Sequence, residues 1–177
     1  MNKTKMTALL ALVLLVVGAV SAWAAADILG LWKIIDDKTN KPTAYVLLYM
    51  NGGKLYGRMM ATISKESGLI EDTILTKTKK ADALAGDPPN CGLDFVYEMQ
   101  AKGNDWRGSI IDPSDGKAYD CTIKRDGNKL IVRGSLKGTG GLLGRNQTWI
   151  LANLGEFPAN FPLPDPKTFV PVIPRKK

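Results

Sequence analysis

Apolar and polar residues alternate in short runs along most of this chain, and turn-forming residues separate the runs. Between Leu93 and Met99 every odd-numbered residue is apolar, whereas Asp94 and Glu98 fall between them. Because successive side chains of a β-strand point to opposite faces, this alternation predicts a strand with one buried and one wet face. Eight such strands are predicted, over residues 30–35, 43–50, 54–63, 93–99, 106–111, 118–124, 130–135 and 143–151.

The connections between these runs are mostly short turns. Asn51-Gly52-Gly53 and Asp126-Gly127-Asn128 contain residues that accept the backbone angles of tight hairpins, and no long helix is predicted. We therefore expect an all-β fold, an eight-stranded antiparallel meander. Closure into a barrel is favoured because it removes the exposed edges of an open sheet and buries its apolar face. A two-sheet sandwich is the alternative.

Three segments interrupt the pattern. Residues 64–90 form a long connection, in which a short helix over 72–84 is possible. Residues 137–141 are a flexible, glycine-rich connection. Residues 156–177 hold six of the ten prolines and are expected to form a tail that is extended along the surface or in solution. The barrel domain is therefore predicted over residues 25–155.

The first 24 residues have the pattern of a secretory signal peptide. Lys3 and Lys5 precede an apolar run over residues 6–20, and Ala22-Trp23-Ala24 supplies small residues at a cleavage site. A membrane anchor is the alternative, but the run is shorter than the roughly 20 residues that span a bilayer. The sequence thus predicts an exported protein, most simply periplasmic, without a transmembrane segment after cleavage.

The two cysteines, Cys91 and Cys121, would then lie in an oxidising compartment, where pairing is the default. The predicted strand order opposes pairing, because it places Cys121 in the middle of one strand and Cys91 before a strand two places away. A disulfide and two buried free thiols both remain open.

Composition removes several classes of function. The chain has no histidine, which excludes Ser-His-Asp hydrolysis, His-ligated zinc and imidazole proton shuttles. The formal charge is +7, but the basic residues are interleaved with acidic ones, as on a solvated surface rather than a nucleic-acid site. The glycine-rich segment 138–145 lacks the P-loop lysine, and Asp112, Asp115 and Asp120 have turn spacing rather than that of a calcium loop. We therefore expect no enzyme activity, cofactor, metal or nucleic-acid partner.

Residues from both ends of the predicted barrel would meet where it closes. Gly30 would let the first and last strands approach closely, and Trp32 would stack against Arg145 or Arg133. On the last strand Arg145, Gln147 and Trp149 alternate with other residues and share one face. If that face points inward, they meet in the barrel interior, either as ligand contacts or as a plug that satisfies its own hydrogen bonds.

Several motifs resemble known proteins in their order. The Gly-x-Trp first strand (Gly30-Leu31-Trp32) with a late arginine is similar to lipocalin and calycin barrels. Residues 53–57 (GKLYG), 111–113 (IDP), 116–119 (GKAY) and 144–149 (GRNQTW) together resemble the exported bacterial family called domain of unknown function 2147. This resemblance covers residues 30–150 and implies a lipocalin-like periplasmic barrel with a possible cavity for an apolar ligand. It implies no established reaction.

Two functions are consistent with these observations. The first is a lipocalin-like protein that binds a small apolar or amphipathic molecule, with polar contacts from Arg145 and Gln147. The other candidate residues, which would form the wall, are Phe95, Tyr97, Met99, Tyr119 and Trp149. The second is a non-enzymatic envelope interaction module with a fully packed barrel and an exposed apolar patch.

Overall fold

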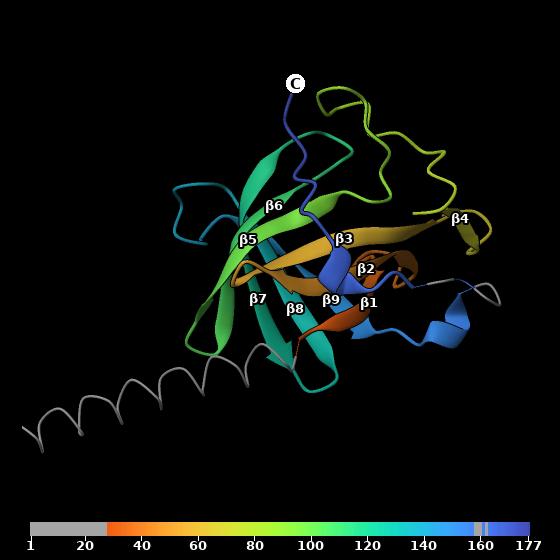
Figure 1. Cartoon of the computed structure of the whole chain (residues 1–177). Helices are drawn as coiled ribbons and strands as arrows, with labels where there is room; N and C mark the ends of the chain where they lie inside the picture. Colours follow the sequence, from red (N-terminus) through yellow and green to blue (C-terminus); the bar gives the residue numbers. More distant parts are fainter. Residues whose placement is uncertain (1–27, 158–160, 162) are drawn as a thin grey trace, which may run out of the picture.

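The computed structural model describes residues 28–157, 161 and 163–177 (Figure 1). The predicted signal peptide therefore lies outside the described residues. The strands are β1 (Gly30–Ile35), β2 (Pro42–Asn51), β3 (Lys54–Ile63), β4 (Ile70–Thr73), β5 (Asp94–Lys102), β6 (Asp105–Ile111), β7 (Ala118–Asp126), β8 (Lys129–Ser135) and β9 (Gly144–Leu151). Two short 3₁₀ helices follow, η1 (Leu154–Glu156) and η2 (Pro166–Thr168).

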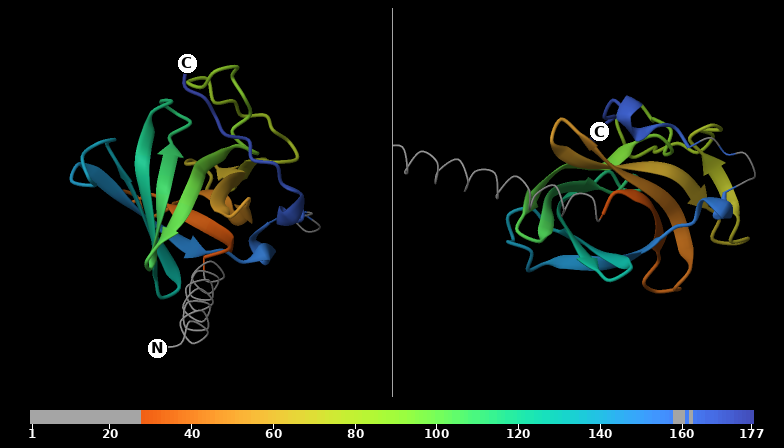
Figure 2. Two further views of the ribbon diagram at one scale, coloured as in Figure 1. Left: turned by 60° about the vertical axis from the view of Figure 1, so that its left-hand side comes forward. Right: turned by 60° about the horizontal axis from the view of Figure 1, so that its bottom comes forward.

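Eight of these strands form a closed antiparallel barrel. Each pairs with its neighbour in the order β1-β2-β3-β5-β6-β7-β8-β9, and β9 pairs back with β1. The strands form a ring when the molecule is tilted from the first view (Figure 2, right). The all-β meander barrel predicted from the sequence is confirmed, and the sandwich is not observed. The additional strand β4 pairs with residues 61–63 of β3.

The short helix suggested for residues 72–84 is wrong. β4 ends at Thr73, and turns follow instead of helix. The side chains of Asp72 and Thr73 accept hydrogen bonds from the backbone N–H groups of residues 75, 76, 78 and 79. Such local side-chain acceptors compete with helical hydrogen bonding, which accounts for the extended path.

The barrel interior is packed at the end where the β2–β3, β5–β6 and β7–β8 turns lie. Trp32 and Trp149 are fully buried there, together with Leu48, Met99 and Leu130. The indole N–H of Trp32 donates to the carbonyl of Ile28 at 2.9 Å. The guanidinium over the Trp32 ring is that of Arg125, 5.1 Å from its centroid, so the expected pairing with Arg133 or Arg145 is wrong.

Glycine is needed at position 30 for a different reason from the one expected. A β-carbon at this position would meet nothing within 4 Å, so close strand approach does not require glycine. The backbone conformation is what requires glycine here, because its φ is +121° and residues with a β-carbon rarely adopt that angle.

A second apolar cluster covers the outside of the barrel. Leu31, Tyr45, Leu47, Tyr49, Tyr56, Met60, Ala61 and Ile63 form it with Phe157 and Phe169 of the C-terminal segment. Strands β2 and β3 are thus buried on both faces, because the C-terminal segment lies along the outside of the barrel (Figure 2). The ring of Phe169 packs edge-on against Tyr49, with centroids 5.0 Å apart. The proline-rich tail is therefore held against the surface.

A buried ion pair attaches this tail to the barrel. Asp94 is fully buried, and Arg58 donates to both of its carboxylate oxygens, at 3.2 Å through Nε and 2.6 Å through Nη2. Tyr49 donates to Asp94 as well. From the tail, the N–H of Val172 donates to Asp94 at 2.6 Å, while the carbonyl of Val170 accepts from Arg58 at 2.7 Å. Arg58 and Asp94 thus neutralise each other, and the tail completes the hydrogen bonding of both groups.

Cys91 and Cys121 are free, buried thiols and do not form a disulfide. Of the two alternatives left open by the sequence, the structure has the free thiols. Burial, with a contribution from the nearby Asp72 carboxylate, raises the pKa of Cys91 to about 12. Burial raises the pKa of Cys121 to about 12. Because the thiolate is the reactive form, neither sulfur is an effective nucleophile near neutral pH.

Asp72 makes a pH-dependent contribution to stability. Burial acts to raise its pKa, but hydrogen bonds from Thr76, Thr78 and Lys79 outweigh burial and lower the pKa to about 2, from 3.8. A carboxyl with a lowered pKa in the folded state stabilises the fold above its unfolded pKa and loses that contribution as the pH falls towards the folded value. The difference corresponds to about 2 kcal/mol.

We therefore expect Asp72→Asn to flatten the decrease in unfolding free energy between about pH 5 and pH 2. Urea unfolding across this pH range measures it. Asp82→Asn is the control, because Asp82 is exposed and makes no side-chain hydrogen bond or ion pair within the described chain. An unchanged acid slope in the Asp72 variant would contradict this assignment.

Candidate functional site

A cavity of about 590 Å³ opens at the other end of the barrel. It lies between the ends of the strands, beside the β6–β7 turn and the β8–β9 loop. Its wall is mainly apolar and includes Ile34, Ala44, Met59, Phe95, Ile110, Ile111, Pro113, Val132, Leu136 and Leu143. The remaining lining residues are Thr43, Asp112, Tyr119, Gly134, Gly144, Arg145 and Gln147.

Few charged or polar side chains face this cavity. The Asp112 carboxylate is already hydrogen-bonded within the β6–β7 turn, where it accepts from the N–H and the hydroxyl of Ser114. Arg145 lies at the rim, two-thirds exposed, and its Nε is 3.3 Å from the carboxylate of Asp37 in the β1–β2 turn. Deeper in, the indole N–H of Trp149 donates to Oε1 of Gln147 at 2.9 Å. This bond orients the Gln147 amide group.

The structure brings together four of the seven candidate ligand-binding residues. Phe95, Tyr119, Arg145 and Gln147 line the cavity. Trp149 does not line the cavity. It lies fully buried behind two residues that do: its ring centroid is 6.0 Å from that of Phe95, and its indole N–H donates to Gln147.

Tyr97 and Met99 are not among the lining residues. Met99 is fully buried in the inner core, and Tyr97 is half-buried against both cores. β5 descends from the cavity towards the packed end of the barrel, which takes Met99 away from the opening. Register shifts of β5 against β3 and β6 also interrupt the alternation that would have placed Tyr97 on the same face as Phe95.

Arg133 points away from the cavity and anchors the β8–β9 loop. Its guanidinium donates to the carbonyls of Gly141 and Leu142 and to the side chain of Asn146. This loop carries three exposed leucines, Leu136, Leu142 and Leu143. Two of them, Leu136 and Leu143, also line the cavity, so the apolar wall continues to the outer surface.

Sequence reasoning missed most of the apolar lining, including Ile34, Met59 and Val132. The signal was present, because each occupies an inward position of an alternating strand. What the alternation could not show is where along each strand the packed interior gives way to a cavity.

Two other kinds of feature are absent from the described part of the chain. No group of three or more histidine, cysteine, aspartate or glutamate side chains is placed to hold a metal ion there. Within the same residues, no helix is long and apolar enough to cross a bilayer.

Comparison with known proteins agrees with this architecture. A lipocalin-family protein of Helicobacter pylori, HP1028, has a similar structure, with a TM-score of 0.58 and 18% sequence identity; the match covers 73% of this chain and 85% of that one. No curated protein matches the sequence. Residues 30–150 match the model of a family described as an uncharacterized protein conserved in bacteria. Because that match spans more than half of the chain, the protein belongs to the DUF2147 family.

Proposed function

We propose that this protein is an exported, non-enzymatic barrel that binds a small apolar or amphipathic molecule in the cavity at its open end. The observation that carries the proposal is the cavity itself. Its volume of about 590 Å³ falls within the roughly 300–1,000 Å³ typical of small-molecule sites, and its wall is mainly apolar with a few polar groups. A fully packed envelope module would have no such interior space.

The candidate residues take different parts in this proposal. Phe95 and Tyr119 give aromatic contact area, and Arg145 offers a positive charge at the rim. Because Trp149 occupies Oε1 of Gln147, the two amide N–H donors of Gln147 are left to orient a ligand. Trp149, Met99 and Tyr97 support the wall from the core side and are positioning residues in this scheme.

Export is the second part of the proposal and rests on the sequence of residues 1–24. Intact mass measurement of the protein recovered from the periplasm tests it. We expect a chain that begins at Ala25. An uncleaved chain, or one retained in the cytoplasm, would overturn this part without affecting the cavity.

The binding part is tested by filling the cavity. Gly134 lines it, and a β-carbon there would make ordinary contacts, 3.7 Å from Ile110 and 3.9 Å from Tyr119, without a clash. A larger side chain at this position therefore takes up part of the cavity. We expect saturable binding of the neutral apolar fluorophore N-phenyl-1-naphthylamine to the natural protein, and a loss of about tenfold or more in Gly134→Leu.

The matched control is Gly155→Leu, the same change on the exposed helix η1, outside the cavity. It is expected to bind the fluorophore normally. Native mass spectrometry of the periplasmic protein, followed by organic extraction, then identifies the natural ligand. Binding that Gly134→Leu leaves unchanged, with unfolding curves that superimpose, would place the fluorophore elsewhere and overturn the proposal.

A further inference from the structure

A second hollow adjoins the cavity at the rim. It has a volume of about 560 Å³ and lies between the β1–β2 turn and the β3–β4 turn, where residues 36–42 face residues 64–68. We call it the polar groove, because its walls are made chiefly of charged and hydroxyl side chains. Thr43 and Arg145 line both the polar groove and the apolar cavity. The two spaces therefore meet at these residues.

The polar groove carries an excess of positive charge. Lys38, Lys41, Lys65 and Arg145 line it, against Asp36 and Glu66. The Asp36 carboxylate is already engaged, because its Oδ1 accepts from the N–H groups of residues 38 and 39 and from the Thr39 hydroxyl.

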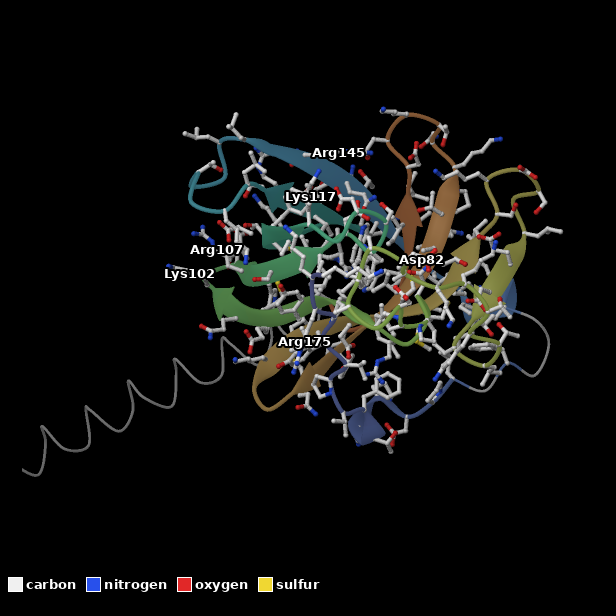
Figure 3. The ribbon with its side chains drawn as sticks, turned by 90° about the horizontal axis from the view of Figure 1, so that it is seen from above. Asp82, Lys102, Arg107, Lys117, Arg145 and Arg175 are labelled. Carbon is white, nitrogen blue, oxygen red and sulfur yellow. The ribbon has the colours of Figure 1, made fainter. Side chains whose placement is uncertain are left out.

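Within the described chain, the three lysine ammonium groups of the polar groove make no ion pair. Arg145 makes one, through Nε to Asp37 at 3.3 Å. From above, Arg145 lies on β9 beside the β1–β2 turn and well apart from Lys102 (Figure 3). Four cationic residues thus line the groove that adjoins the opening of the apolar cavity.

We propose that the polar groove binds a phosphate monoester headgroup, and that the cavity holds the apolar chain of the same amphiphile. This inference rests on the proposed function and narrows its ligand class. A phosphate dianion supplies several acceptor oxygens to lysine ammonium and arginine guanidinium donors, which form their shortest hydrogen bonds with ionised acceptors. Arg145 would donate to the headgroup phosphate through its Nη groups, and this contact would replace its exposed ion pair with Asp37.

The experiment compares two lipids that differ only in the phosphate. Lauroyl lysophosphatidic acid and monolauroylglycerol have the same acyl chain and glycerol, so their affinity ratio isolates the headgroup. Below their critical micelle concentrations, we expect calorimetric titration to give about tenfold tighter binding of the phosphorylated lipid. Raising the salt concentration should weaken its binding and leave that of the neutral lipid unchanged.

Substitution of the groove lysines tests whether the phosphate group binds in the polar groove. The double variant Lys38→Gln/Lys41→Gln should lose most of the preference for the phosphorylated lipid while binding monolauroylglycerol normally. The control Lys102→Gln/Lys124→Gln removes the same charge from exposed residues towards the packed end of the barrel and should keep the preference.

The outcomes separate the two proposals. Equal binding of both lipids would overturn the headgroup assignment and leave the proposed function intact. Binding of neither lipid by a protein that still binds the fluorophore would overturn the amphiphile proposal alone, and loss of fluorophore binding as well would overturn both. A preference retained in Lys38→Gln/Lys41→Gln would place the headgroup elsewhere. Titration with inorganic phosphate alone completes the set, since affinity equal to that of the phosphorylated lipid would make free phosphate the ligand and overturn the amphiphile proposal.

Discussion

Asp94→Ala is expected to lower the free energy of unfolding by about 3–5 kcal/mol, because it breaks a buried ion pair by removing one partner. The change leaves the Arg58 guanidinium buried without its carboxylate. It also removes the acceptor of the Tyr49 hydroxyl and of the Val172 N–H. Urea unfolding followed by tryptophan fluorescence measures the loss. The tail should also become sensitive to protease at a lower urea concentration than in the natural protein.

Lys54→Gln is a matched control, because Lys54 and Glu98 form an ion pair between the same two strands, β3 and β5, but on the surface. Its cost should be below about 1 kcal/mol, as for exposed ion pairs in general. Equal losses in the two variants would show that the buried pair has no special weight. Asp94→Asn retains the shape of the side chain and keeps the comparison possible if the alanine variant does not fold.

Trp149→Ala is expected to cost about 3–5 kcal/mol, since it removes a fully buried indole that packs against Phe95. The indole also holds the Gln147 amide group, so affinity for the cavity probe should fall in the molecules that remain folded. Thermal unfolding with and without the probe separates the two effects.

Leu151→Ala on the same strand is the control, because Leu151 is more than half exposed, and its cost should stay within about 0.5 kcal/mol. A Trp149→Ala variant that keeps its stability and loses only affinity would contradict the positioning role. Trp149 would then be a direct ligand contact, as the shared face of Arg145, Gln147 and Trp149 suggests.

The barrel was predictable because its signals are local. Alternation within each run fixes which side chains point inward, and turns such as Asn51-Gly52-Gly53 join consecutive strands, so order and direction follow from the chain itself. The register of β9 with β1 is a contact between distant residues, yet it follows once the other strands are placed. β4 escaped prediction because its four residues, Ile70–Thr73, are too few to show a period.

The docking of the tail against the barrel was harder to predict from the sequence. Its proline content suggests an extended segment, but the residues that bind it, Arg58 and Asp94, are far away in sequence and look like ordinary wet-face residues of strands. One sign was available in β2, where residues 44–50 are apolar without interruption. A continuous apolar run is typical of a strand buried on both faces, and a barrel strand can be so only if something covers its outside.

For the candidate site, the sequence predicts which side chains point into the barrel but not which residues they contact there. The inward face shared by Arg145 and Gln147 follows from alternation, and both line the cavity. The partner of Trp32 does not follow, because Arg125, Arg133 and Arg145 are equivalent in residue type, and only the three-dimensional path of β7 and β8 selects Arg125. The polar groove depends on two turns from different hairpins, which no pattern along one segment can bring together.

The buried ion pair also has a consequence for the order in which the molecule forms. Arg58 and Asp94 are made early in synthesis, but the tail groups that complete their hydrogen bonds lie 112 and 78 residues later. In a chain synthesised from its N-terminus, the side of the Arg58–Asp94 pair that faces the tail is open to water until residues 170–172 have been added. Docking of residues 170–172 is thereby a late step of folding, in which the Val170 carbonyl and the Val172 N–H replace water around an ion pair that the barrel strands have already brought together.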